Sequence, residues 1–202
     1  MASRLGVTDA SVGDAEALTK LVYSAAPKLL SDIFGGGNSE QTQQFLATCF
    51  AQPHGQFGFD NHRVVRDAEQ VVGSVCGWHD QLPSNFDGAT VTQLHQFFGF
   101  AKSVEILERN RVISRWIKPP EKQEYAIGHL SVAPTHRRRG IAQLLLTNCL
   151  EAAQRMNKHQ VLLDVETTNH AAIQCYLKFG FSASPQTSES PYVRLTMAVA
   201  KP

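Results

Sequence analysis

Residues 129–142 of the 202-residue chain read HLSVAPTHRRRGIA. We expect a β-strand over residues 124–132, which leads into this stretch, and an amphipathic helix over residues 141–156, where apolar side chains recur at helical spacing. Between the two, Gly140 has no side chain and can adopt backbone angles that are closed to other residues. Ala142 is the next smallest choice. The stretch therefore predicts a strand, a tight loop and the start of a helix.

A loop of this kind is an anion-binding site, because the first N–H groups and the positive dipole end of the helix point into it. Arg137, Arg138 and Arg139 add positive charge, and a pyrophosphate is the natural ligand. The alternative interpretation is a basic, solvated turn that only begins a helix. Two other phosphate-binding loops are excluded, because neither G-x-x-x-x-G-K-[ST] nor G-x-G-x-x-G occurs in the sequence.

The remaining sequence indicates a mixed α/β sheet, with hairpins at both ends and strands alternating with helices in the middle. A hairpin is expected at residues 61–78, where Asp67-Ala68-Glu69 supplies the turn. Residues 160–165 are apolar on both faces, as in a central buried strand. The expected strands are 3–8, 61–66, 70–78, 124–132, 160–165 and 192–198, and the expected helices are 14–25, 28–34, 40–51, 92–118, 141–156 and 169–179.

Composition and charge narrow the class of protein. The chain is 43% hydrophobic, which suits one domain over residues 1–202 with a helical insertion at about residues 80–120. Its net charge of +1 provides no field that would attract nucleic acid or an acidic membrane. The four cysteines form no C-x-x-C pair, so free thiols are expected. With neither a signal peptide nor an apolar span in the sequence, we expect a cytoplasmic monomer or homodimer that binds no membrane.

Three motifs resemble the signature of the GNAT superfamily of N-acetyltransferases. Arg137–Ala142 is similar to the R/Q-x-x-G-x-G/A loop of that family, and residues 129–134 resemble the L-x-V-x-P end of the preceding strand. The downstream pattern N-x-x-A-x-x-x-Y-x-x-x-G-F is matched by Asn169, Ala172, Tyr176, Gly180 and Phe181. The motifs stand in family order and spacing over about residues 125–181. The hairpin at 61–78 matches loosely and residues 92–118 do not match.

This resemblance implies an α/β (α+β) fold with a mixed, mostly antiparallel central sheet, flanking helices and a splayed central strand pair. It implies acetyl-CoA as the cosubstrate, with no metal. Free backbone groups of Leu130 and Val132 would pair with the pantetheine arm, and the amides of residues 138–142 would hold the pyrophosphate. The implied cofactor-binding residues are Leu130, Ser131, Val132, Arg137, Arg138, Arg139, Gly140, Ile141, Ala142, Asn169, Ala172 and Tyr176.

Two of these residues have other roles open to them. The resemblance makes Tyr176 the acid that protonates the departing CoA thiolate, a role that a nearby phenol can fill. Tyr176 could instead be an amphipathic core residue with a satisfied hydroxyl. Asn169 would reach the pantetheine, or it could simply cap the helix that follows it.

The sequence departs from the family pattern at the general base, the residue that accepts the proton of the amine. Family members often carry a carboxylate or histidine two or four residues before the leucine at the position of Leu130, but Gly128 and Ala126 stand there. His129 is a candidate base in their place. Strand alternation, however, turns its side chain to the face opposite that of Gly128 and Leu130 unless the strand bulges. Glu124 lies further out. We therefore expect a distributed relay through water with no single indispensable side chain, and the alternatives are His129 or a residue from the inserted segment.

Two functions fit these observations. The first is transfer of an acetyl group from acetyl-CoA to a primary amine of a small molecule or peptide, which Tyr176 favours. The second is a non-catalytic acyl-CoA sensor on the same fold, which the residues at 126 and 128 favour. An RNA-binding role is excluded by the low net charge and the lack of an aromatic platform. The aromatic segment 92–118 is expected to cover the acceptor side of the cleft.

Overall fold

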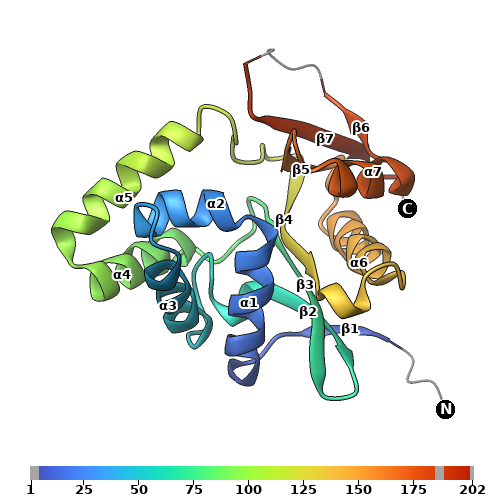
Figure 1. Cartoon of the computed structure of the whole chain (residues 1–202). Coiled ribbons are helices and arrows are strands. Elements are labelled where there is room, and N and C mark those ends of the chain that lie inside the picture. Colours follow the sequence, from blue (N-terminus) through green and yellow to red (C-terminus); the bar gives the residue numbers. More distant parts are fainter. Residues whose placement is uncertain (1–4, 185–188, 201–202) are drawn as a thin grey trace.

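The computed structural model describes residues 5–184 and 189–200. Over these residues the chain forms one seven-stranded sheet in the order β1-β2-β3-β4-β5-β7-β6 (Figure 1). Neighbouring strands are antiparallel except for β4 and β5, which are parallel. The strands are β1 (Val7–Asp9), β2 (His62–Asp67), β3 (Gln70–Trp78), β4 (Glu124–Val132), β5 (Gln160–Glu166), β6 (Ser182–Ala183) and β7 (Tyr192–Ala198). This arrangement confirms the mixed, mostly antiparallel sheet expected from the sequence.

Helices cover both faces of the sheet. Figure 1 shows α1 to α5 on one side and α6 and α7 on the other. The α-helices are α1 (Ala15–Ala25), α2 (Pro27–Leu30), α3 (Ser39–Phe50), α4 (Phe86–Phe98), α5 (Phe100–Ile113), α6 (Ile141–Arg155) and α7 (His170–Phe179). Short helical turns lie at Val12–Asp14, Ser31–Gly35, Phe59–Asn61 and Pro134–His136. None of the described helices is long and apolar enough to cross a membrane.

Each face of the sheet has its own hydrophobic core. Under α6 and α7 the core includes Val75, Leu145 and Leu163. Under α1 to α5 it includes Leu18, Phe45 and several further phenylalanines. Because the sheet buries both faces, β5 is apolar on both sides, as its sequence predicts. All four cysteines are unpaired thiols.

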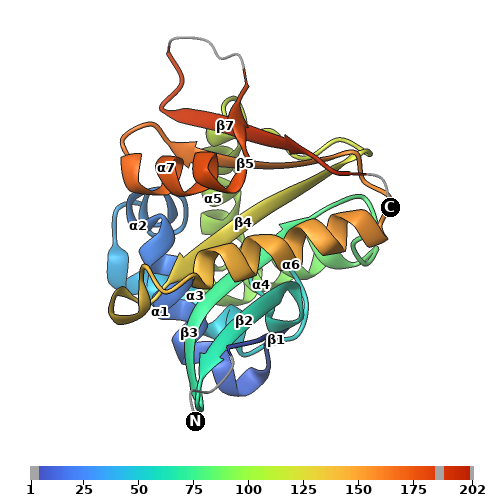
Figure 2. The same cartoon turned by 90° about the vertical axis from the view of Figure 1, so that its right-hand side faces the viewer.

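The central strands β4 and β5 separate along their length. They are paired only at the start, where Glu124, Tyr125 and Ala126 face residues 160–162. Beyond Ala126 the two strands diverge, which Figure 2 shows as a gap with α7 on one side and α6 on the other. The edge of β4 that faces β5 therefore carries backbone groups with no strand partner, and this is the splayed pair expected from the sequence.

A β-bulge interrupts β4 immediately after the splay begins. Ser131 is opposite Ser74 and Gly128 is opposite Cys76, so His129 and Leu130 together face a single residue of β3. His129 has a positive φ of 51°. Strand alternation predicted that His129 would lie on the opposite face from Gly128. The structure corrects this, because the extra residue places the His129 side chain on the face covered by α1 to α5, the same face on which a Cβ of Gly128 would lie, and turns Leu130 toward the α6 core.

The predicted helix at residues 92–118 is two helices. The first begins earlier, at Phe86, and the chain bends at Gly99, whose φ of 76° cannot continue a helix. The bend also divides the aromatic run that was expected to be buried. Phe97 and Phe98 pack on the core, whereas Phe100 is 73% exposed. The strand expected at residues 3–8 is Val7–Asp9, and residues 3 and 4 lie outside the described residues.

Candidate active site

A cavity of about 1230 Å³ occupies the gap between β4 and β5. Residues 126–132 of β4 form one wall and residues 162–166 of β5 form another. The loop before α6 closes one end through Arg137 and Arg138, and α7 contributes Tyr176. Nine of the twelve cofactor-binding residues that the resemblance implies line this cavity, and Arg139, Gly140 and Ile141 do not.

The loop before α6 has the geometry of an anion site. Gly140 is the N-cap of α6 with φ 80° and ψ 0°, a left-handed conformation that glycine adopts without strain. Arg138 also has a positive φ, of 60°. The Arg137 side chain folds back, and its Nε donates to the Val132 carbonyl at 3.3 Å. The first amides of α6 are thus free of side-chain caps and face the loop.

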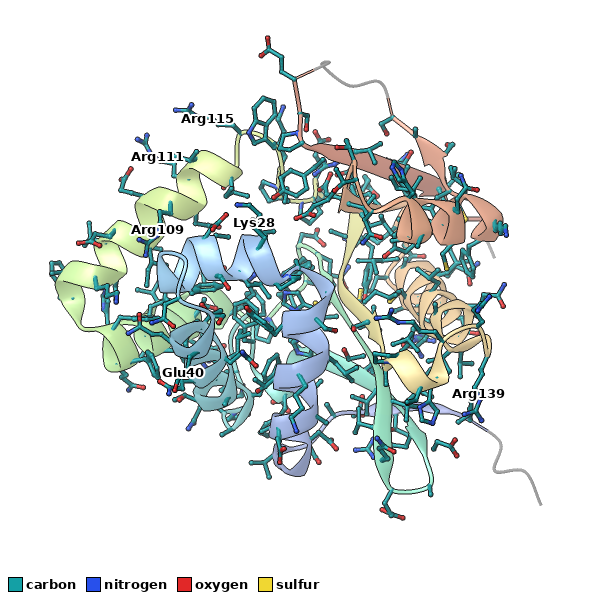
Figure 3. All side chains as sticks on the ribbon, viewed as in Figure 1. Lys28, Glu40, Arg109, Arg111, Arg115 and Arg139 are labelled. Atoms are coloured by element: carbon teal, nitrogen blue, oxygen red, sulfur yellow. The ribbon has the colours of Figure 1, made fainter. Side chains whose placement is uncertain are left out.

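Two residues of this loop direct their side chains away from the cavity. The Arg139 guanidinium donates to the Asp67 carboxylate at 3.3 Å and lies at the outer edge of the molecule (Figure 3). The Ile141 side chain is 2% exposed and belongs to the core under α6. Any contact of these two residues with a pyrophosphate must therefore come from their backbone amides.

The wall formed by β4 presents both backbone and side-chain groups. Leu130, Ser131 and Val132 all line the cavity, and Ala142 of α6 lines it next to them. The Ser131 hydroxyl is bound to the Ser24 hydroxyl of α1 at 3.0 Å. Since the edge of β4 that faces β5 is unpaired beyond Ala126, the backbone groups on that edge are available to an extended ligand such as a pantetheine arm.

Helix α7 brings three further predicted residues to the cavity. Asn169 caps the helix, because its side-chain oxygen accepts a hydrogen bond from the Ala172 amide at 3.2 Å. Asn169, Ala172 and Tyr176 all line the cavity. Burial raises the pKa of the Tyr176 hydroxyl, so the phenol is protonated around neutral pH. A protonated phenol can donate a hydrogen bond or a proton.

His129 lines the cavity and lies among aromatic rings on the side of the sheet covered by α1 to α5. Its Nδ1 is 3.0 Å from Nε2 of His62, and its ring stacks on Phe57 at a centroid distance of 4.9 Å. The Trp78 indole lies nearly perpendicular to it, with the two ring centroids 5.1 Å apart. Burial, and secondarily the neighbouring His62, lowers the pKa of His129 well below its usual value, so the imidazole is neutral.

The Trp78 side chain fills the space beside Gly128, one of the two positions at which the resemblance led us to look for a carboxylate or histidine. A Cβ built on Gly128 would lie 1.8 Å from the indole ring, so no side chain fits there. Ala126 faces Trp78 across the strand pair. Glu124, the other carboxylate considered, accepts a hydrogen bond from the Glu121 amide at 2.8 Å at the start of the strand.

Sequence reasoning did not identify His62, Phe57 or Trp78 as parts of the site. These residues contact His129 from two separate segments of the chain, and no local sequence motif marks them as part of a site. The one available signal was strand parity, because His62 and the buried Val64 lie on the same face of β2. The segment that includes α4 and α5 also lines the cavity, through Phe86, Thr90, Leu94, Leu107, Asn110 and Ile113.

Comparison with known proteins identifies the family. A model of the acetyltransferase (GNAT) family matches residues 25–181. The chain is 24% identical over 122 residues to the L-methionine sulfoximine/L-methionine sulfone acetyltransferase of Salmonella typhimurium, covering 57% of this chain and 70% of that protein. It is 28% identical over 101 residues to N-acetyltransferase family 8 member 7 of Mus musculus. That match covers 45% of this chain and only 44% of the mouse protein.

Solved structures share the fold over nearly the whole chain. An N-acetyltransferase from Staphylococcus aureus Mu50 superposes with a TM-score of 0.66 at 19% identity, covering 95% of this chain and 99% of that one. A putative acetyltransferase from Salmonella typhimurium, solved with its cofactor acetyl-CoA, gives a TM-score of 0.53 at 13% identity, covering 97% and 94%. At these identities the likeness concerns the fold.

Proposed function

The chain belongs to the GNAT family of acetyltransferases, and from this premise we propose that it transfers an acetyl group from acetyl-CoA to a primary amine of a small molecule or peptide. The observation that carries the proposal is the cavity itself. It joins an uncapped helix N-terminus with two arginines, an unpaired strand edge, a protonated tyrosine and a neutral histidine around one space.

The groups on one side of the cavity suit acetyl-CoA. The free amides at the start of α6, with Arg137 and Arg138 near them, suit its pyrophosphate. The open edge of β4 at Leu130 and Val132 suits the amide groups of pantetheine, which need partners in an apolar wall. This arrangement would place the thioester near the bulge of β4, between His129 and Tyr176.

The proposed reaction is a direct transfer. The amine nitrogen attacks the thioester carbonyl, the C–N bond forms and the C–S bond breaks. The nitrogen loses its proton to Nε2 of His129, and the departing thiolate takes a proton from the Tyr176 hydroxyl. Solvent returns the proton from His129 to Tyr176, so that one amine and one acetyl-CoA give one amide and one free thiol.

The acceptor side of the cavity favours an amine attached to an apolar group. Its walls include Phe86, Leu94, Leu107 and Ile113 from α4 and α5. A pocket enclosed by helices suits a small molecule or the end of a peptide better than a folded protein surface. The Salmonella relative, by its name, acetylates small amino-acid analogues, which supports the same choice.

Thiol release tests the proposal. The purified chain is mixed with acetyl-CoA and a panel of small amines and short peptides, and free CoA is measured with a thiol reagent. We expect release that depends on the amine and yields one acetylated product per thiol. Binding of acetyl-CoA by calorimetry without amine-dependent release would contradict the proposal and favour the sensor function.

A further inference from the structure

His62 is completely buried and makes two hydrogen bonds through its ring. Its Nδ1 is 3.0 Å from the carbonyl oxygen of Gly58, and its Nε2 is 3.0 Å from Nδ1 of His129. A carbonyl oxygen can only accept a hydrogen bond, so His62 must carry its proton on Nδ1. In a neutral ring the other nitrogen, Nε2, is then an acceptor.

The protonation of His129 follows from that of His62. Since Nε2 of His62 accepts, Nδ1 of His129 must donate. The neutral ring then has a lone pair on its own Nε2. Burial lowers the pKa of His62 to about 4, with a smaller effect from Arg63 in the same direction, so both rings are neutral. The Gly58 carbonyl therefore sets the tautomers of two histidines in series.

The remaining nitrogen of His129 is directed to the cavity. His129 lines the cavity, and none of the described residues makes a hydrogen bond to its Nε2. Among the described residues, the buried polar side-chain atoms without a partner belong to Gln93 and Arg109. Nε2 of His129 is thus an accessible lone pair. Phe57 stacks on the imidazole of His129 and the Trp78 indole packs perpendicular to it, and these two contacts fix the direction of this lone pair.

Cys76 completes a group of three possible metal ligands, because ligand atoms of His62, Cys76 and His129 all lie within 4.8 Å of one another. The ring geometry nevertheless matches a hydrogen bond. The planes of the two imidazoles differ by 10°, and their centroids are 5.3 Å apart. This centroid distance equals the 3.0 Å between the two nitrogens plus about two ring radii, so both nitrogens lie close to the line that joins the centroids. The two nitrogens therefore point at each other, whereas ligands of a shared ion would both point at a third position.

We propose that His62 is a positioning residue, which holds His129 in the Nδ1–H tautomer and thereby presents the Nε2 lone pair to the incoming amine. This inference deepens the proposed function and depends on it for its catalytic meaning. It assigns His129 as the base in place of the carboxylate that Gly128 lacks. His62 itself touches neither substrate, since it is completely enclosed.

The experiment uses two matched variants and one spectroscopic measurement. His62→Gln keeps an oxygen acceptor at the distance of Nε2, whereas His62→Asn keeps a donor toward Gly58 but leaves no acceptor for His129. Long-range ¹H–¹⁵N spectra report which nitrogen of His129 carries the proton, with the signals assigned by loss in His129→Gln. We expect the Nδ1–H tautomer in the wild type and His62→Gln, and a shift toward Nε2–H in His62→Asn.

Kinetics then connect the tautomer to the reaction. His62→Asn should lower kcat on the order of 10²-fold, with the KM for acetyl-CoA unchanged, and His62→Gln should stay within about fivefold of the wild type. In a His129→Ala background, His62→Asn should have no further effect on kcat, because the group that it positions is gone.

Several outcomes would overturn the inference. The first is an Nε2–H tautomer in the wild type, which needs no His62 variant and so remains decisive if His62→Asn does not fold. Equal losses of kcat in the Asn and Gln variants, or additive losses with His129→Ala, would make His62 merely structural. The spectra do not require turnover, so a wild type without amine-dependent thiol release would refute the proposed function while leaving the tautomer measurement intact.

Discussion

The indole of Trp78 fills the space beside Gly128, so closely that a Cβ at position 128 would lie 1.8 Å from the ring. The two residues lie on neighbouring strands, β3 and β4, at the point where β4 leaves β5. The lack of a carboxylate at this position is therefore a matter of packing. The ring that replaces it also meets His129, so one substitution can test both contacts.

Gly128→Ala should displace the Trp78 ring. Overpacking of this kind typically costs about 1–3 kcal/mol of unfolding free energy, and movement of the ring should raise the KM for the amine. Denaturant unfolding and steady-state kinetics measure the two effects. The matched control is Gly88→Ala in α4, where a Cβ meets nothing within 4 Å and should stabilise the helix slightly. A Gly128→Ala protein as stable as the wild type would contradict the close contact.

Gly140→Val should weaken acetyl-CoA binding at least tenfold. A β-branched residue is strained at φ 80°, and its methyl groups would project from the first turn of α6 into the loop. Calorimetry with the folded variant measures the affinity. Gly37→Val has comparable strain, at φ 94°, but lies outside the cavity, so it should cost stability without a change in affinity. Unchanged affinity in folded Gly140→Val would refute the assignment of the loop.

Tyr176→Phe should leave acetyl-CoA binding nearly intact and lower kcat by roughly 10²–10⁴-fold, the usual range for a positioned acid. Tyr125→Phe is the control, because Tyr125 is also buried with a raised pKa but does not line the cavity. The kcat of Tyr125→Phe should therefore equal that of the wild type. If Tyr176→Phe loses binding and rate in equal measure, the hydroxyl has a structural role.

Leu107→Ser should raise the KM for an apolar amine about tenfold without a comparable change in the KM for acetyl-CoA, since one lost apolar contact in a pocket is worth about 1–3 kcal/mol. Leu107 lines the cavity from α5. Val104→Ser on the same helix is the control, because Val104 is 44% exposed and lies outside the cavity. Point changes are required, because Leu94 and Ile106 belong to the core, and deletion of α4 and α5 would expose it.

The parts of the structure that the sequence predicted well are those with strong local patterns. Strands β3, β4 and β7 have the predicted bounds, and α6 ends one residue earlier than expected. Of the loop residues that the motif singled out, Arg137, Arg138 and Ala142 line one end of the cavity, whereas the side chain of Arg139 turns to Asp67 and that of Ile141 enters the core.

The parts that the sequence did not predict depend on contacts between distant segments. The bulge at His129 arises from pairing with β3, and period-two alternation assumes a regular strand. The partner of His129 is His62, 67 residues earlier, and its direction is visible only after the sheet is assembled. The bend at Gly99 is a local signal, but the apolar residues on both sides of it favour one continuous helix.

The pH dependence of the reaction should follow the acceptor amine and not a histidine. Burial lowers the pKa of His62 to about 4 and that of His129 well below its usual value, so both rings are in the neutral, base form around neutral pH and above. Burial raises the pKa of Cys76 and of Tyr176, so both stay protonated around neutral pH. His79 also lines the cavity, and burial lowers its pKa from the ordinary value, which favours the neutral ring there too. The ionisation that controls attack is then that of the amine, which attacks only when it is neutral.

We therefore expect kcat/KM to rise about tenfold per pH unit below the pKa of the amine and to level off at that pKa. Two acceptors of similar shape but different pKa should give profiles displaced by the difference between their pKa values. The same displacement should persist in His129→Ala at a lower absolute rate. An inflection near pH 6.5 that is common to both acceptors and disappears in His129→Ala would contradict this expectation. It would mean that His129 gains a proton in the working pH range, and that its ring is solvated well enough to hold the charge.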